Sequence, residues 1–421
     1  MIGRGWGVLV AESARLAFGS IRAQPLRSTL AVAGVVIGIV TVTLVTSILA
    51  GARNQVALLF REFGSDNIFA YHRRGDPYTP ATQAEAQRRP LDPALAEPLA
   101  RLGEHIRDVA VMLIVPTVSG GRPLVARSGG AEADRVLVEG VTANYLEVVA
   151  EELAAGRPFT RVEERSGARV AILGANVAEA LFGRGRAVGR EMRLAGVRFF
   201  VVGEAAPRKG AFFGENRQDN VIQVPLGTAR RLYPDAEAAV FYIRAEPERR
   251  DLAVAESEAI LRRLRRLAPD APNDFHLSTA DQIIAQFDRL SGLIGAVTVL
   301  LAAVSLAIGG LGVANVMIIS VTERTREIGL RRAIGARRRE VLRQFLLEAA
   351  MLSLAGGLVG VAVAAALGAL LTLVAPGLAA APPVWAVVGG VAASFVTGLV
   401  AGFGPARHAA ALDPVEALRY E

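Results

Sequence analysis

The chain has 421 residues, of which 52% are hydrophobic, and its mean hydropathy is positive. Such a composition is unusual for a soluble protein of this length and predicts a membrane protein. The net charge of +7 lies mostly beside apolar segments rather than in one basic patch, which argues against nucleic-acid binding. The sequence contains no cysteine, which excludes disulfides, a thiolate nucleophile and cysteine-ligated metal.

Four apolar stretches each reach the roughly 20 residues that cross a bilayer. We predict transmembrane helices at residues 28–52, 290–322, 349–374 and 384–403, none of which contains Asp, Glu, Lys or Arg. The first stretch is longer than the apolar region of a signal peptide, so we interpret it as a retained anchor. The chain is therefore predicted to span the membrane four times.

The arginine distribution predicts the orientation of these spans. Residues 1–27 and 323–348 are arginine-rich, and the link between the last two spans carries no charge. The positive-inside rule then places residues 1–27, 323–348 and 404–421 in the cytoplasm. Residues 53–289 would lie outside.

The predicted external segment, 53–289, has the pattern of a mixed α and β domain. Apolar runs predict strands at 67–71, 108–116 and 239–245, and a β-rich insertion at about 135–224. Residues 191–203 predict a hairpin that turns at Ala195–Gly196. An amphipathic helix is expected at 251–267, and Ser278 to Asp281 matches a capping box.

The fold class is therefore a membrane protein with four transmembrane α-helices and a large α+β extracytoplasmic domain between spans one and two. We expect a larger α+β lobe with a β-rich inserted lobe.

Sequence signatures of catalysis and cofactor binding are missing. The one lysine, Lys209, is followed by Gly210, so there is no Walker A loop. The four histidines lack metal-ligand spacing, and no Gly-x-Ser-x-Gly elbow occurs. We therefore expect no catalytic residue, no metal and no cofactor on this chain.

Residues 323–348 form a basic segment between the second and third spans. Glu327 and Arg331 are spaced to pair along a helix, and Ile328 and Ile334 add apolar groups at near-helical spacing. Gly335-Ala336 predicts a break before a second helix at 338–347. The pattern suits docking into a groove of a partner, and equally a basic loop on anionic lipid.

Motifs along the chain resemble known permeases. E-R-T-R-E-I-G-L-R-R-A-I-G-A (323–336), L-x-x-F-L-L-E-A (342–349) and the glycines of span three are similar to the FtsX-type permease domain, which would cover 290–421. The segments 25–40, 140–146, 156–159 and 413–418 resemble MacB-type ABC permeases. The resemblance covers essentially the whole chain.

This resemblance implies the permease subunit of an ABC exporter in a bacterial inner membrane. Only about 27 residues precede the first span, so we expect a separate ABC ATPase subunit that binds the ATP. The permease would form a homodimer in membrane lipid and transmit ATP-driven motion outward, so by itself it would not be an enzyme. A membrane-fusion adaptor protein is a further partner to consider.

The resemblance also assigns a coupling region for the ATPase. Glu327 and Arg331 would be polar contacts, and Ile328 and Ile334 would be apolar anchors. The complete set expected to couple is Glu323, Arg324, Glu327, Ile328, Arg331, Arg332, Ile334, Gly335 and Ala336.

Two alternatives stay open within this architecture. One is a permease that extracts lipoproteins or lipids from the outer leaflet. The other is a cell-division-type transducer whose external domain activates a wall hydrolase.

Overall fold

The structure is a computed structural model that describes residues 25–62, 66–73, 88–116, 118–119, 122–134, 136–207, 219–374 and 381–419. The chain divides into two compact units. One, the helical unit, comprises residues 1–52 and 288–421, and the other, the folded domain, comprises residues 53–287. The predicted N-terminal segment, 1–27, lies almost entirely outside the described residues.

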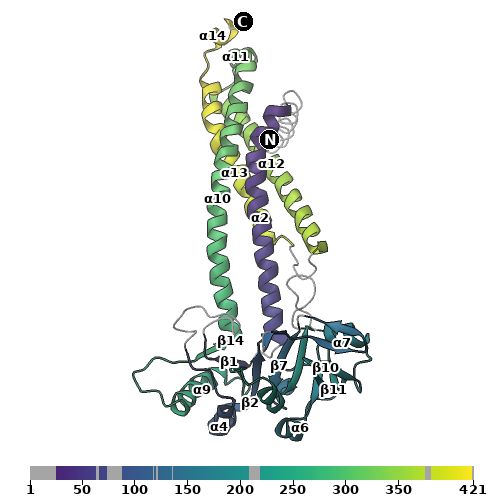
Figure 1. The fold of residues 1–421 in the computed structure, drawn as a ribbon. Coiled ribbons are helices and arrows are strands. Elements are labelled where there is room, and N and C mark those ends of the chain that lie inside the picture. Colours follow the sequence, from purple (N-terminus) through teal and green to yellow (C-terminus); the bar gives the residue numbers. More distant parts are fainter. Residues whose placement is uncertain are drawn as a thin grey trace. The chain divides into compact units, whose positions relative to one another are not determined.

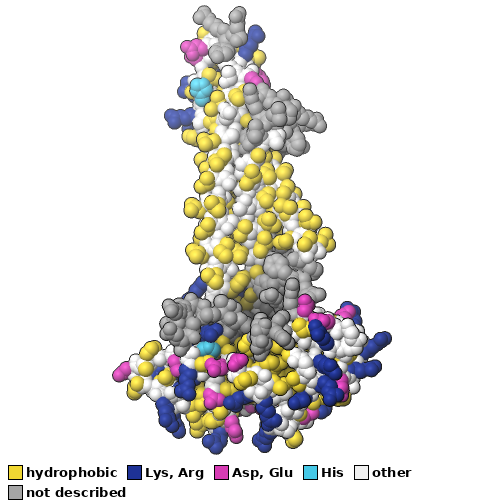
Figure 2. Space-filling view, in the orientation of Figure 1, with side chains coloured by type: hydrophobic (Ala, Val, Ile, Leu, Met, Phe, Trp, Pro, Cys, Tyr) yellow, Lys and Arg dark blue, Asp and Glu magenta, His cyan; other side chains and the backbone are white. Residues whose placement is uncertain are grey.

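Four long helices contain the predicted spans (Figure 1). They are α2 (Pro25–Glu62), α10 (Ala280–Glu323), α12 (Arg338–Val374) and α13 (Val384–Ala411). Each is long and apolar enough to cross a membrane, which confirms the prediction of four spans. Hydrophobic side chains dominate the visible middle of the helical unit, and charged side chains gather at the end that carries α11 and α14 (Figure 2).

Glycines allow the helices of this unit to approach closely. A Cβ added to Gly34 on α2 would lie 2.7 Å from the Cα of Gly309 on α10. On α12, a Cβ at Gly356 would meet Val32 of α2 at 2.6 Å, and one at Gly357 would meet the Ser394 hydroxyl of α13 at 2.1 Å. Small residues are what close helix packing in a membrane requires, because lipid tails provide no hydrophobic driving force between helices.

The folded domain is built on one 12-stranded sheet. Its order is β14-β1-β13-β2-β7-β12-β9-β11-β10-β5-β6, with β8 also paired to β11. The strands are β1 (Asn67–Tyr71), β2 (Ile106–Val115), β5 (Ala126–Ser128), β6 (Ala131–Ala133), β7 (Leu137–Val141), β8 (Leu153–Gly156), β9 (Val170–Leu173), β10 (Glu191–Leu194), β11 (Val197–Ala205), β12 (Val221–Pro225), β13 (Ala239–Ala245) and β14 (His276–Thr279). A separate two-stranded sheet contains β3 (Val118–Ser119) and β4 (Arg122–Pro123).

The predicted β-rich insertion continues this sheet, because its strand β7 pairs with β2. The β-rich part also begins earlier than the predicted boundary at 135. Strand β5 pairs with β10, and β6 pairs with β5, although both precede that boundary. The short strands around residues 126–133 have too little alternation to be recognised from their sequence alone.

Both faces of the sheet are buried, as the alternation in the central strands shows. On β13, Phe241 and Ile243 belong to one apolar cluster, and Val240 and Tyr242 belong to another. Since successive side chains of a strand point to opposite faces, two cores result. The first is covered by α4 (Ala96–Leu102), α7 (Ala175–Phe182), α8 (Leu226–Leu232) and α9 (Arg250–Leu264), and the second by α5 (Tyr145–Val148).

Two local predictions for this domain have different outcomes. The hairpin is confirmed: β10 and β11 pair antiparallel, and the turn places Ala195 at φ 48° and Gly196 at φ 86°. The capping box at Ser278 and Asp281 is wrong by one residue. Thr279 and Gln282 exchange the two bonds, at 3.2 and 3.3 Å, because α10 begins at Ala280, which makes Thr279 the residue directly before the helix. Asp281 instead binds Arg250.

The external motifs that carry the family resemblance have structural roles. In residues 140–146, the Thr142 hydroxyl accepts the Val111 amide at 3.1 Å, and Asn144 donates to the Val109 carbonyl at 3.1 Å. In residues 156–159, Phe159 is buried in the second core, and Gly156 has φ 87°. A Cβ at Gly156 would lie 2.2 Å from the Val202 carbonyl oxygen, so only glycine fits.

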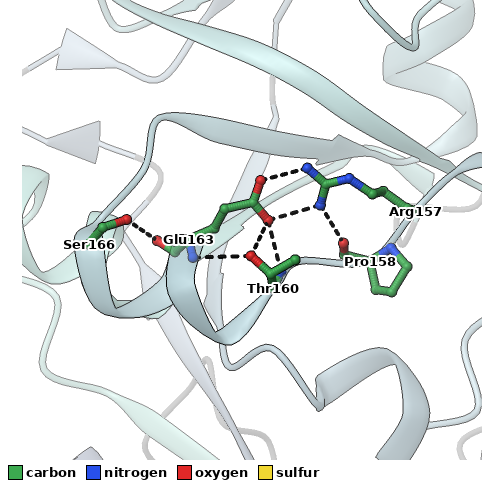
Figure 3. A network of polar contacts seen from close by, with 5 residues as sticks. All are labelled: Arg157, Pro158, Thr160, Glu163 and Ser166. Atoms are coloured by element: carbon green, nitrogen blue, oxygen red, sulfur yellow. Dashed lines mark hydrogen bonds and ion pairs between the residues drawn. The ribbon is translucent and has the colours of Figure 1, made fainter.

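The helix after the second motif, α6 (Arg161–Ser166), is held by a polar network (Figure 3). Thr160 and Glu163 form a capping box in which each side chain binds the other's backbone amide. Arg157 donates to both carboxylate oxygens of Glu163, at 2.9 and 2.7 Å. The Arg157 guanidinium thereby lowers the pKa of Glu163 to about 2, with further help from the Thr160 bonds.

We expect Glu163→Gln to loosen α6 at neutral pH and to make this helix less sensitive to acid. The pKa of Glu163 is below its ordinary value of 4.5, so the ionised side chain stabilises the native state fully above that pH. That contribution is lost as the pH falls from about 4.5 to about 2. The expected cost at pH 7 is about 1 kcal/mol. Hydrogen exchange of residues 160–167 in variant and wild type at equal pH measures it, and equal protection at pH 7 would contradict it.

Candidate functional site

The charged segment between the second and third spans folds as one short helix with a tight exit. Helix α11 runs over Thr325–Ala333, after α10 ends at Glu323 and before α12 begins at Arg338. The Ala336 amide donates to the Arg331 carbonyl at 3.1 Å and the Gly335 amide to the Arg332 carbonyl at 3.1 Å. This is the Schellman arrangement, in which the residue after the helix takes a positive φ. The break predicted at Gly335-Ala336 is confirmed, with Gly335 at φ 110°.

One face of α11 packs within the helical unit. Thr325, Ile328 and Gly329 are buried, at the i, i+3, i+4 spacing of a single helix face. Ile328 is 3% exposed and shares an apolar cluster with Val341 and Phe345 of α12. This inner face therefore belongs to the protein's own core.

The opposite face of α11 is exposed. It carries Arg326, Glu327, Leu330, Arg331 and Ile334, which we call the outer face. Leu330 is 52% exposed and Ile334 is 79% exposed, so two large apolar side chains lie among charged ones. Glu327 and Arg331 form the expected i, i+4 ion pair, and Arg331 also donates to Gln344 of α12 at 3.0 Å. Apolar groups framed by charges on a short rigid helix suit binding by another protein.

A second short helix, α14 (Pro414–Arg419), supports α11 from the C-terminal end of the chain. Asp413 accepts the Val415 amide at 2.8 Å, and Pro414 occupies the first helical position, where its missing amide costs nothing. A Cβ at Gly329 of α11 would lie 2.6 Å from the Ala417 Cβ. The Glu-Ile-Gly and Asp-Pro-Val-Glu-Ala-Leu motifs, far apart in the sequence, thus pack on each other.

The predicted coupling residues therefore divide between two roles. Glu323, Glu327, Arg331, Ile334 and Gly335 are exposed, while Arg324, Arg332 and Ala336 are half-buried. Arg332 donates to the Leu412 carbonyl at the end of α13. Ile328, expected to be an apolar anchor for the ATPase, has its side chain buried in the apolar cluster of this chain. Leu330 and Ile334 are the exposed apolar side chains of the outer face.

Several residues of the site are absent from the predicted set. Leu330 and Arg326 lie on the outer face and Gly329 on the inner face, while Gln344 binds Arg331 and Glu348 binds Arg324. Glu348 did give a signal, since it is the one acid at the start of the third apolar run. The contact between Gly329 and Ala417 has no corresponding signal in the sequence. Among the described residues, no group of three or more His, Asp or Glu could hold a metal ion.

Gly335→Val is expected to strain the exit from α11. A β-branched residue at φ 110° is a backbone outlier, and such strain costs about 1–3 kcal/mol. Within the described residues, no atom other than those of Gly335 and its two chain neighbours lies within 4 Å of the added Cβ, so the effect arises from the backbone conformation. Faster tryptic cleavage in residues 324–339 of the folded variant measures it, with Ala336→Val as the control. Equal cleavage of Gly335→Val and wild type would refute the expectation.

The four long apolar helices are those of a multi-pass membrane protein, and comparison with known families identifies its class. Residues 28–260 match the family described as MacB-like periplasmic core domain, and residues 299–414 match the FtsX-like permease C-terminal family. The chain belongs to the MacB-type, FtsX-domain family of ABC transporter permeases.

Curated relatives align with nearly all of the chain. It is 34% identical over 422 residues to the pyoverdine export ATP-binding/permease protein PvdT of Pseudomonas putida, covering 99% of this chain and 61% of the relative. It is 35% identical to the PvdT of Pseudomonas syringae pv. tomato over 397 residues, 94% of this chain and 57% of the relative. The chain thus spans about three-fifths of the length of these relatives.

Two solved structures are similar to about half of the chain at low sequence identity. The periplasmic region of MacB from Actinobacillus actinomycetemcomitans is 14% identical, with a TM-score of 0.43 over 54% of this chain and 95% of that one. The extracellular domain of the noncanonic ABC-type transporter YknZ from Gram-positive bacteria is 16% identical, with a TM-score of 0.37 over 51% of this chain and 100% of that one.

Proposed function

We propose that this chain is the permease component of an ABC exporter and that the outer face of α11 docks on the ATPase. The ATPase binds and hydrolyses ATP, and the permease passes the resulting motion to its folded domain on the other side of the membrane. The chain itself carries no catalytic group and no cofactor. Two copies work together in the bacterial inner membrane, with both termini and α11 in the cytoplasm.

The observation that carries this proposal is the two-sided character of α11. Its inner face is fixed in the helical unit through Ile328 and Gly329, and its outer face presents Leu330 and Ile334. A loop that only held anionic lipid would need its arginines but would not need two exposed apolar side chains on a rigid helix. This combination favours a protein partner over lipid headgroups.

Two further facts support transmission and export. Helix α10 is uninterrupted from Ala280 to Glu323, so one helix belongs in part to each unit and ends directly before α11. The names of the relatives describe export together with ATP binding. They support an export role for this chain, with an ATPase as its partner.

Affinity purification from the native membrane, with identification of the bound proteins, tests this proposal. We expect stoichiometric recovery of an ABC ATPase, and recovery of an adaptor would add the export pathway. Recovery of an external wall hydrolase without any ATPase would instead support a transducer. Recovery of lipoproteins bound to the folded domain would instead support a permease that extracts lipoproteins from the membrane.

A further inference from the structure

Helix α12 carries a buried carboxylate, that of Glu348. Glu348 has 3% of its side chain exposed, and Phe345, Ala349 and Leu352 near it on α12 are buried as well. An ionised carboxylate in such surroundings is costly unless a positive group and hydrogen bonds compensate it. The residue is therefore expected to have a specific partner.

That partner is Arg324, whose Nη1 donates to Oε1 of Glu348 at 3.3 Å. Arg324 is the single residue between the end of α10 and the start of α11, so it forms the elbow between these helices. Next to it, the Thr325 hydroxyl donates to the carbonyls of Val321 and Thr322 in the last turn of α10, at 3.0 and 2.9 Å. The elbow is thus tied both to α10 and to α12.

The position of this pair distinguishes it from the other polar links of α11. The Arg331–Gln344 bond is exposed, so water competes with it and it contributes little. Glu348 lies out of water, so solvent does not compete with its ion pair to Arg324. A buried pair of this kind rarely adds net stability over an apolar contact, but it can fix one arrangement against others.

We infer that Arg324 and Glu348 are positioning residues that lock the α10–α11 elbow to α12, so that α11 and the third span move together. This inference rests on the proposed function, which makes α11 the receiver of ATPase motion. The apolar contacts of Ile328 alone would let α11 slip against α12, since such contacts are not directional. The ion pair holds the two elements in one register.

Glu348→Gln provides the first test, in the complex of permease and ATPase reconstituted in nanodiscs. The variant keeps the side-chain shape, removes the charge and leaves the outer face unchanged. We expect ATPase capture at the wild-type level and at least about a fivefold loss of permease-dependent stimulation of ATP hydrolysis. Arg324→Lys retains the positive charge and is expected to keep most of the stimulation.

A double-mutant cycle separates this role from simple destabilisation. If the two side chains act as a pair, Arg324→Gln combined with Glu348→Gln should lose no more stimulation than either single variant. If the loss of stimulation in the double variant equals the product of the two single losses, the inference is overturned. Full stimulation in Glu348→Gln would also overturn it. Should Glu348→Gln fail to fold, Arg324→Gln and Arg324→Lys decide the matter through the same stimulation.

Spin-label distances provide a readout that needs no ATPase, and the cysteine-free sequence makes labelling specific. Labels at the exposed positions Ile334 and Phe403 report α11 against α13, and labels at Val363 and Val396 report α12 against α13. In Glu348→Gln we expect a broader distribution for the first pair and an unchanged one for the second. Unchanged distributions for both would overturn the inference. If wild type captures no ATPase, the proposed function fails, and these distances alone decide the role of the ion pair.

Discussion

Replacing Gly309 with leucine is expected to disrupt the helical unit. A Cβ at this position would lie 2.5 Å from the backbone nitrogen of Val35, and backbone atoms cannot rotate away as a side chain can. Helices α2 and α10 would have to separate, at a cost of about 3 kcal/mol. The thermal midpoint of the purified protein in detergent, followed by size-exclusion chromatography, measures this loss.

Gly295→Leu is the matched control, because Gly295 lies on the same helix and its added Cβ, apart from the helix's own backbone nearby, meets no atom of the described residues within 4 Å. It makes the same change of side chain away from the contact between α2 and α10, so the thermal midpoint should stay at the wild-type value. If Gly309→Leu and Gly295→Leu have the same midpoint, the backbone contact between α2 and α10 does not hold the unit together.

Ile334→Glu is expected to weaken ATPase docking at least about tenfold while the permease remains folded. Ile334 is 79% exposed, so its replacement removes little packing within this chain. A carboxylate would have to lose its water on entering an apolar pocket of the partner, and such anchors commonly contribute 2 kcal/mol or more to binding. Titration of the purified ATPase against the permease in nanodiscs gives the change in Kd.

Val162→Glu on α6 is the matched control for this change. Val162 is 75% exposed and belongs to the folded domain, whereas α11 belongs to the helical unit. The same substitution there should leave the Kd unaltered. An unaltered Kd for Ile334→Glu would remove α11's outer face from the docking surface.

The features with a local signal could be predicted from the sequence. Spans follow from uninterrupted apolar runs, and the exit from α11 follows from Gly335, the residue type that tolerates φ 110°. The hairpin at Ala195–Gly196 has its own turn residues. Each of these depends on neighbouring residues alone, which is why the prediction succeeds.

The inner and outer faces of α11 could not be predicted in the same way. Ile328, Leu330 and Ile334 are all apolar, and periodicity cannot tell which of them the rest of the chain covers. That is decided by α12, α13 and α14, since Ile328 packs with Val341 and Phe345 and Gly329 meets Ala417. The Arg324–Glu348 pair likewise joins residues 24 positions apart, one between α10 and α11 and the other on α12.

Photo-crosslinking from α11 tests the central claim most directly. A photoreactive residue at Ile334, on the outer face, should form an adduct with the ATPase in intact cells, and the same residue at Val162 should not. The adduct should carry a nucleotide-binding subunit identified by peptide sequencing. Adducts at Ile334 with lipid alone would contradict the account and leave α11 as a basic helix at the membrane surface.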